Sequence, residues 1–256
     1  MSVLLSEVKD GILSLTLNRP EAINAFTTEM LQSLAEALGK EASAPEVRVV
    51  VLRGAGRGFC SGQDLREFEG KKVNFKAHLK KYQAVVENIA GLEKPVLAAV
   101  HGAAAGAGMS LALACDLRIA ASDAVFTTGF SKIGLIPDAG MNYHLPRIVG
   151  HAKAMELELL SSRLNAEQAL ALGIVNRVFP TESFADEVTK LATELANGPT
   201  KTFGLIKRAL QKSRSATIEE MLEYEALLQD LAGRTEDHKE GVQAFYEKRP
   251  AKFAGK

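Results

Sequence analysis

The apolar residues of the first 180 positions follow two different periods. Residues 11–17 place a leucine at every second position, which predicts a half-buried strand. Residues 47–52 and 96–100 are almost wholly apolar, so each predicts a strand that is buried on both faces. Two shorter apolar runs, at residues 117–120 and 124–126, predict further short strands.

Between these strands the apolar residues recur at helical spacing. Residues 30–38 predict one helix, for which Gly39 is the expected C-cap. Apolar and aromatic residues at helical spacing over 79–89 predict a second helix. This helix should end before Pro95, because the residue that precedes a proline disfavours helical backbone. Repeated strand and helix units of this kind predict an α/β fold.

The pattern changes after residue 150. Residues 152–160 predict a helix. Asn165 and Gln168 have the spacing of a capping box, and the helix that they begin should end at Gly173. Residues 174–179 then predict the last strand of the chain.

Only helices are predicted from about residue 182 onward. Thr217 and Glu220 form a second capping-box pair in front of an apolar run. We therefore divide the chain into an α/β core, residues 1–195, and a helical region, residues 196–256. A helical tail after an α/β core is typical of an element that joins subunits or forms a lid.

Composition and charge narrow the class of protein. The chain has 256 residues, with 31 acidic and 31 basic side chains and a net charge of zero, which argues against a general nucleic-acid or membrane-surface role.

Its two cysteines, Cys60 and Cys115, make neither a disulfide framework nor a zinc set, and we expect both to be buried thiols. The chain opens without a basic and then apolar leader, and its apolar stretch near residues 95–115 is interrupted by a histidine and three glycines. We expect a cytoplasmic protein.

One carboxylate stands in an apolar, turn-rich stretch, residues 133–142. Asp138 follows Pro137, and the residues before them are almost all apolar or glycine. A turn role would explain an aspartate after a proline. A carboxylate that lies among apolar residues also loses solvation and becomes more basic, which is what a group that moves protons on carbon requires.

Two glycine-rich segments, residues 58–65 and 101–110, each follow a predicted buried strand. Their small residues allow a ligand to approach backbone amides closely, and the second segment leads into a helix-like run. Tight packing of a strand on a helix would call for the same residues. An oxyanion hole made from one backbone amide of each segment is the functional interpretation.

Two other site types suit these segments poorly. A dinucleotide-binding loop would need a small residue where the chain has Leu111. A serine nucleophile at Ser110 lacks the glycine spacing of a nucleophile elbow. His101 and His144 are the histidines nearest to these motifs in the sequence, and neither has an evident triad partner.

Five segments in order carry a resemblance to a known family. They are residues 18–25 (NRPEAINA), 59–65 (FCSGQDL), 104–116, 133–140 (IGLIPDAG) and 244–250 (AFYEKRP). Together they resemble the enoyl-CoA hydratase/isomerase (crotonase) family over essentially the whole chain. The resemblance implies a crotonase (ClpP-like) spiral of ββα units with a helical C-terminal trimerisation region, and a homotrimer or a dimer of trimers.

The resemblance also implies an acyl-coenzyme A thioester as the substrate. Its carbonyl oxygen would lie between the backbone N–H groups of Gln63 and Ala107. No cofactor or metal is implied, because coenzyme A is part of the substrate, and neither a nucleic acid nor a membrane is an expected partner. The pocket walls would come from residues 68–82 and from Phe130, Met141, Tyr143 and His144. The positions implied to bind the substrate are Ala22, Ala25, Ser61, Asp64, Leu65, Arg66, Gly106 and Phe130.

Two departures from the family pattern bear on the reaction. Family hydratases carry two glutamates, and this chain has Ser110 and Phe130 at the corresponding positions. Hydration needs both an acid and a base, so the chain is poorly equipped for it. Asp138 instead stands where isomerases and dehalogenases of the family keep their acidic residue. One carboxylate and an oxyanion hole suffice for a proton shift, so we expect an acyl-CoA isomerase that acts through a thioester enolate or a related oxyanion.

Two alternatives remain open from the sequence. An enoyl-CoA hydratase would have to use another carboxylate, such as Glu156 or Glu158. A non-catalytic CoA-binding protein would have no need of an acid at Asp138.

Overall fold

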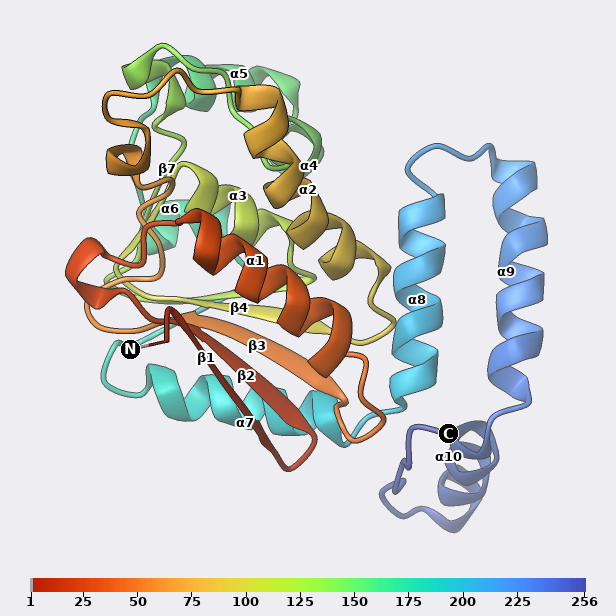
Figure 1. Cartoon of the computed structure of the whole chain (residues 1–256). Coiled ribbons are helices and arrows are strands. Elements are labelled where there is room, and N and C mark those ends of the chain that lie inside the picture. Colours follow the sequence, from red (N-terminus) through yellow and green to blue (C-terminus); the bar gives the residue numbers. More distant parts are fainter. Residues whose placement is uncertain (1) are drawn as a thin grey trace.

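The computed structural model describes residues 2–256, and a six-stranded sheet forms the centre of its fold (Figure 1). The sheet order is β1 (Leu4–Lys9), β2 (Ile12–Leu17), β3 (Val49–Gly54), β4 (Val96–Val100), β6 (Leu117–Ala121) and β9 (Arg177–Phe179). Neighbouring strands are parallel, except that β1 and β2 form an antiparallel hairpin. The leucines of β2 are fully buried and alternate with half-buried residues, as their period of two predicts.

A second, smaller sheet stands on the first. It contains β5 (Ala103–Ala105), β7 (Val125–Thr127) and β8 (Leu164–Asn165). β4 and β6 of the large sheet are each followed directly by a strand of the small sheet and then by a helix. This repeat confirms the predicted spiral of ββα units.

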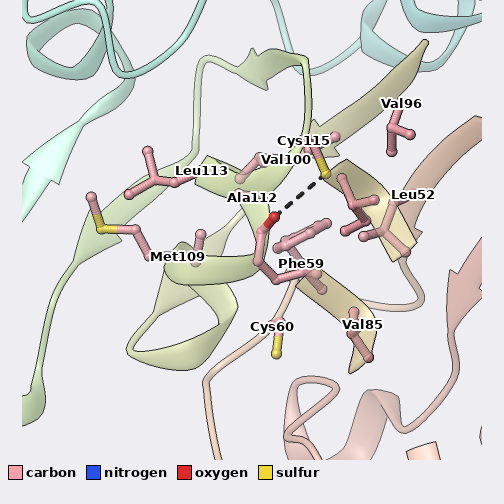
Figure 2. Packing of buried hydrophobic residues seen from close by; sticks show 14 of the residues in the cluster. Leu52, Phe59, Cys60, Val85, Val96, Val100, Met109, Ala112, Leu113 and Cys115 are labelled. Atoms are coloured by element: carbon pink, nitrogen blue, oxygen red, sulfur yellow. Dashed lines mark hydrogen bonds between the residues drawn. The ribbon is translucent and has the colours of Figure 1, made fainter. Parts of the chain in front are cut away.

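Helices cover both faces of the large sheet (Figure 1). The helices α1 (Thr28–Glu36), α2 (Phe75–Gly91) and α3 (Ala107–Ala114) cover one face, and α7 (Phe184–Ala196) packs on the other. Met109, Ala112 and Leu113 of α3 belong to the same buried cluster as Leu52 of β3 and Val100 of β4 (Figure 2).

Both cysteines lie in this core as free thiols, as expected. The Cys115 thiol donates to the carbonyl oxygen of Leu111 at 3.4 Å, the contact drawn as a dashed line in Figure 2. Burial raises the pKa of both thiols to about 12, so neither is a thiolate near neutral pH.

Three further helices belong to this part of the chain: α4 (Met141–Val149) and α5 (His151–Leu160) lie between β7 and β8, and α6 (Ala166–Ala171) follows β8. The Asn165–Gln168 capping box begins α6, as predicted. The strand that follows is shorter than expected. The N–H groups of Ile174 and Val175 donate to the Ala169 carbonyl, so only residues 177–179 are free to pair with β6.

The C-terminal helices extend away from the core (Figure 1). They are α8 (Thr200–Lys212), α9 (Ile218–Gly233) and α10 (Glu236–Glu247). Arg48, at the start of β3, joins this region to the core, because its guanidinium donates to Thr200 Oγ1 at 2.9 Å and to the Phe253 carbonyl at 3.0 Å. Within residues 2–256 no helix is long and apolar enough to span a membrane.

Gly39 is not a C-cap, contrary to the sequence prediction. The helix α1 continues without a break into a π-helical turn, Ala37–Glu41, and Gly39 lies inside that turn. A Cβ at this position would lie 3.3 Å from the side-chain nitrogen of Asn88 on α2. The glycine therefore allows α1 and α2 to approach each other closely.

Candidate active site

The two glycine-rich segments lie side by side, because the first pairs with β5, which belongs to the second. The Cys60 N–H donates to the Ala103 carbonyl, and the Ala105 N–H donates to the Cys60 carbonyl, each at 2.9 Å. Gly62 has a φ of +101°, and a Cβ there would lie 3.5 Å from the backbone nitrogen of Ala107. A glycine at this position thus allows the two segments to meet.

Two backbone N–H groups point out of this junction. On either side of Gln63, the Phe26 N–H donates to the Gly62 carbonyl and the Asp64 N–H donates to the Phe26 carbonyl. Ala107 is the first residue of α3, where an N–H has no partner inside the helix. Within residues 2–256 neither the Gln63 N–H nor the Ala107 N–H donates a hydrogen bond. The pair can hold an oxygen that carries negative charge, and the N-terminus of α3 adds a favourable field.

Asp138 stands in a loop between β7 and α4 that backbone hydrogen bonds hold in shape. The Leu135 N–H donates to the Phe130 carbonyl, and the Met141 N–H donates to the carbonyl of Asp138 itself. The Asn142 side chain donates to the Pro137 carbonyl. These bonds fix the backbone on both sides of the carboxylate.

The Asp138 carboxylate is half-buried, and its buried oxygen has no compensating partner. Its Oδ1 atom is buried and accepts no hydrogen bond from residues 2–256. Burial raises the pKa of this carboxyl from an ordinary 3.8 to about 6. A base with this pKa is ionised at neutral pH and is still basic enough to remove a proton from an activated carbon.

Asp138 and the two amides share one cavity of about 160 Å³. Asp138 is the only carboxylate among the described residues that line it. The α2 side contributes an aromatic wall. The lining residues are Ser61, Gly62, Gln63, Leu65, Phe68, Phe75, His78, Leu79, Tyr82, Ala105, Gly106, Ala107, Gly129, Phe130, Ile133, Leu135 and Asp138.

The predicted binding residues divide into two groups. Four of them line the cavity: Ser61, Leu65, Gly106 and Phe130. The other four lie beside the cavity, on residues 22–25 and 64–66. They are Ala22, Ala25, Asp64 and Arg66. A hydrogen bond from the Ser61 N–H to the Ile23 carbonyl joins these two parts of the chain.

Asp64 has a clear structural role. Its carboxylate is buried and pairs with Arg66 and Arg19, each at 2.9 Å. The hydrogen bonds from Arg66, and then from Arg19, hold the pKa of this carboxyl well below its usual range. Its N–H is also occupied, by the Phe26 carbonyl. Asp64 therefore fixes the loop that carries Gln63.

The positions where family hydratases have glutamates hold no acid here. Ser110 is fully buried inside α3, and its hydroxyl donates to the Gly106 carbonyl at 3.3 Å. Phe130 gives the cavity an apolar wall. Glu156 and Glu158 lie on α5 and do not line the cavity, and Glu156 is exposed and paired with Lys153.

Three residues expected in the pocket wall lie elsewhere. Met141 is buried in the core, and Tyr143 and His144 line a separate hollow between α4 and α8. Burial, together with nearby arginines, lowers the pKa of His144 to about 4. The expectation was wrong because α4 turns this helix face toward α8.

His78 and Tyr82 are the site residues that the sequence analysis did not single out. Both lie on α2, line the cavity and contact the Gln63 side chain. From the sequence, both fell only within the expected pocket wall, residues 68–82, and the helical spacing of Tyr82 also fits a simple core helix. His78, rather than His101 or His144, is the histidine of the site.

The described residues, 2–256, contain no group of three or more side chains suited to hold a metal ion.

Comparison with known proteins finds similarity over nearly the whole chain. The family model described as enoyl-CoA hydratase/isomerase matches residues 7–256. The chain is 45% identical to the 1,2-epoxyphenylacetyl-CoA isomerase of Escherichia coli K12, with 100% of both chains covered. It is 42% identical to a probable enoyl-CoA hydratase of Rhodobacter capsulatus, covering 98% of this chain and 97% of the relative.

A solved structure of a similar protein has the same fold. The putative enoyl-CoA hydratase/isomerase from Mycobacterium abscessus superposes with a TM-score of 0.94 at 36% identity, covering 99% of this chain and 100% of the other. The similarity extends through the core and the C-terminal helices alike. The chain is thus a member of the enoyl-CoA hydratase/isomerase family.

Proposed function

We propose that the protein is an acyl-CoA isomerase in which Asp138 moves a proton while the N–H groups of Gln63 and Ala107 hold the thioester oxygen. The observation that carries the proposal is the shared cavity. One desolvated carboxylate and two free backbone donors line it, and no second carboxylate of residues 2–256 does.

The proton shift can be written with these groups alone. The Asp138 carboxylate takes a proton from C2 of a 3-enoyl thioester, and the electron pair moves onto the thioester oxygen between the two amides. The carboxylic acid then returns the proton to C4, and the double bond lies between C2 and C3. Loss of one such oxyanion donor typically lowers kcat by about 10²–10³-fold, and a placed base contributes about 10²–10⁴-fold.

The substrate that we favour carries a ring. Phe68, Phe75 and Phe130 line the cavity, which suits a flat, apolar group. The similarity to 1,2-epoxyphenylacetyl-CoA isomerase supports the conversion of 1,2-epoxyphenylacetyl-CoA to oxepin-CoA, alongside the shift of a double bond from 3-enoyl-CoA to 2-enoyl-CoA.

The rest of the substrate and the assembly belong to the same proposal. Ala22, Ala25, Asp64 and Arg66, beside the cavity, would contact the coenzyme A portion. Residues 1–195 would hold the acyl-CoA and carry out the reaction, and residues 196–256 would assemble subunits into a homotrimer or a dimer of trimers. Exposed apolar side chains on α9 and α10 support this role.

A turnover screen tests the proposal. The purified protein is given 1,2-epoxyphenylacetyl-CoA, 3-hexenoyl-CoA and crotonyl-CoA in parallel, and the products are separated by chromatography. We expect isomerisation of the first or second substrate and negligible hydration of the third. Hydration of crotonyl-CoA that outpaces both isomerisations would identify a hydratase instead, and binding of all three without turnover would identify a CoA-binding protein.

A further inference from the structure

We propose that the Gln63 side chain is a positioning residue, which Tyr82 and His78 hold so that the Gln63 backbone N–H stays directed at the thioester oxygen. The inference rests on the proposed function, in which that N–H stabilises the enolate. It assigns a role to the helix α2 beyond that of a pocket wall.

The side-chain oxygen of Gln63 accepts two hydrogen bonds from α2. The Tyr82 hydroxyl donates at 2.7 Å and the His78 Nε2 at 2.9 Å. Burial raises the pKa of Tyr82, so its hydroxyl keeps its proton. Two donors fill the two lone pairs of an amide oxygen, which gives His78 the tautomer with a proton on Nε2.

The side-chain nitrogen of Gln63 faces acceptors only. It lies 3.0 Å from the Phe26 carbonyl, 3.2 Å from the Asp64 carbonyl and 3.2 Å from Glu67 Oε2. The Glu67 carboxylate also accepts from the Thr28 N–H, in the first turn of α1. Because donors lie on one side of the amide and acceptors on the other, it has a single satisfied orientation.

The two donors on α2 are themselves held in place by aromatic packing. The Tyr82 ring meets the Phe26 ring edge-on at 5.6 Å, and the His78 ring meets the Phe68 ring edge-on at 5.0 Å. Tyr82 is almost fully buried. This packing restrains both rings in the positions from which they donate to Gln63.

This arrangement fixes a residue whose backbone has a catalytic task. The Gln63 N–H is flanked by backbone bonds to Phe26 on both sides, and the side chain adds a third attachment to α2. A displacement of about 1 Å at a reacting group can lower the rate by about 10²-fold. Because the bond from the N–H to the oxygen strengthens as charge develops, a loosened N–H should lower kcat more than it raises KM.

The test compares single and double variants under saturating and limiting substrate. Gln63→Met keeps the length of the side chain and removes all five contacts, so we expect kcat to fall by about 10- to 100-fold while KM stays within about threefold. Tyr82→Phe should lower kcat several-fold in the wild-type background and should have no further effect in Gln63→Met. In both variants the rate should fall at low pH with the same midpoint as in the wild type, since Asp138 is unchanged.

Asn88→Ala is the matched control. Asn88 lies on the same helix, and its side chain donates to the Ala35 carbonyl at 2.8 Å, away from the cavity. Its removal should lower the melting temperature as much as Tyr82→Phe does and leave kcat unchanged. If Asn88→Ala lowers kcat equally, the effect is general loosening of α2 and the inference is wrong. It is also wrong if Tyr82→Phe still lowers kcat in the Gln63→Met background, because the hydroxyl would then act on the substrate directly.

A spectroscopic readout separates this inference from the proposed function. The infrared carbonyl stretch of bound crotonyl-CoA, labelled with ¹³C at the thioester carbon, reports hydrogen bonding to that oxygen without turnover. We expect a shift to lower frequency in the wild type and a smaller shift in Gln63→Met. Equal shifts in the two proteins would overturn the inference even if isomerisation is found. A smaller shift in the variant would support it even if the turnover screen finds no isomerisation.

Discussion

Gly108, in the first turn of α3, packs directly on Cys60 in the loop that leads to Gln63. A Cβ at position 108 would lie 2.8 Å from the Cys60 Cβ and closer still to the Cys60 carbonyl oxygen. The Ala107 N–H and the Gln63 N–H are near each other because these two backbones touch. The proposed oxyanion pair thus depends on a packing contact between two segments about 45 positions apart in the sequence.

Gly108→Ala should therefore damage both stability and activity. Either the loop or α3 must move to admit the methyl group, and overpacking of this kind typically lowers the free energy of unfolding by about 1–3 kcal/mol. Gly233→Ala is the matched control, because Gly233 ends α9 with open space around it and alanine favours helix by up to about 1 kcal/mol. Urea titration should give changes of opposite sign. Equal stability of the two variants would mean that the loops are not in close contact.

Asp138→Asn should remove the base and keep the shape of the site. We expect kcat to fall by at least about 10²-fold, while the dissociation constant of a saturated acyl-CoA changes little. Stopped-flow turnover and calorimetric titration measure the two quantities separately. A variant with more than a tenth of the wild-type kcat would show that another group moves the proton.

The pH dependence of kcat/KM should carry the signature of Asp138. The carboxylate is the active form and burial raises its pKa to about 6, so the rate should rise with pH through about 6 and then level off. A profile measured from pH 4.5 to 8 in constant ionic strength checks this. A midpoint near 4 would instead indicate that the carboxylate is well solvated.

The same raised pKa predicts the direction of a stability change. Between pH 4 and 6 the folded protein binds more protons at Asp138 than the unfolded chain, so this group contributes less to stability as the pH rises through that range. Asp138→Asn removes the titrating group and with it this decrease in stability. After allowance for partial exposure, we expect the variant to be more stable by about 1 kcal/mol at pH 7.5 and equally stable below pH 4. Thermal unfolding of both proteins across this range is the measurement, and a variant less stable than the wild type at pH 7.5 would contradict the assignment.

The predicted trimer can be tested at an exposed aromatic side chain. Phe245 on α10 is 79% exposed and lies next to Tyr246, which is 77% exposed. If this surface joins subunits, Phe245→Glu should convert the oligomer to smaller species in sedimentation velocity. Glu7→Lys, an exposed change on the edge strand β1 of the core, should leave the assembly intact. A wild-type monomer at micromolar concentration would refute the prediction.

Local sequence patterns predicted much of the fold. The period of two in β2 and both capping boxes, at Asn165 and Thr217, are present as expected. Such features depend on a few neighbouring residues, so they can be read from the chain directly. The edge strand β1 was not anticipated, because its mostly exposed residues, half of them polar, lack an apolar period. Gly39 was misassigned because the constraint at this position is a close contact with Asn88, a residue of another helix.

The sequence by itself determined the alternation of strands and helices in the core, the absence of hydratase glutamates at positions 110 and 130, and the presence of one acid in an apolar loop. Only the tertiary structure brought Asp138 to the cavity that holds the two amides and buried its carboxylate there, which raises its pKa. It also placed Tyr82 and His78 of α2 over the Gln63 side chain. The type of each side chain is fixed by the sequence, whereas its desolvation and its hydrogen bonds depend on neighbours that only folding brings close.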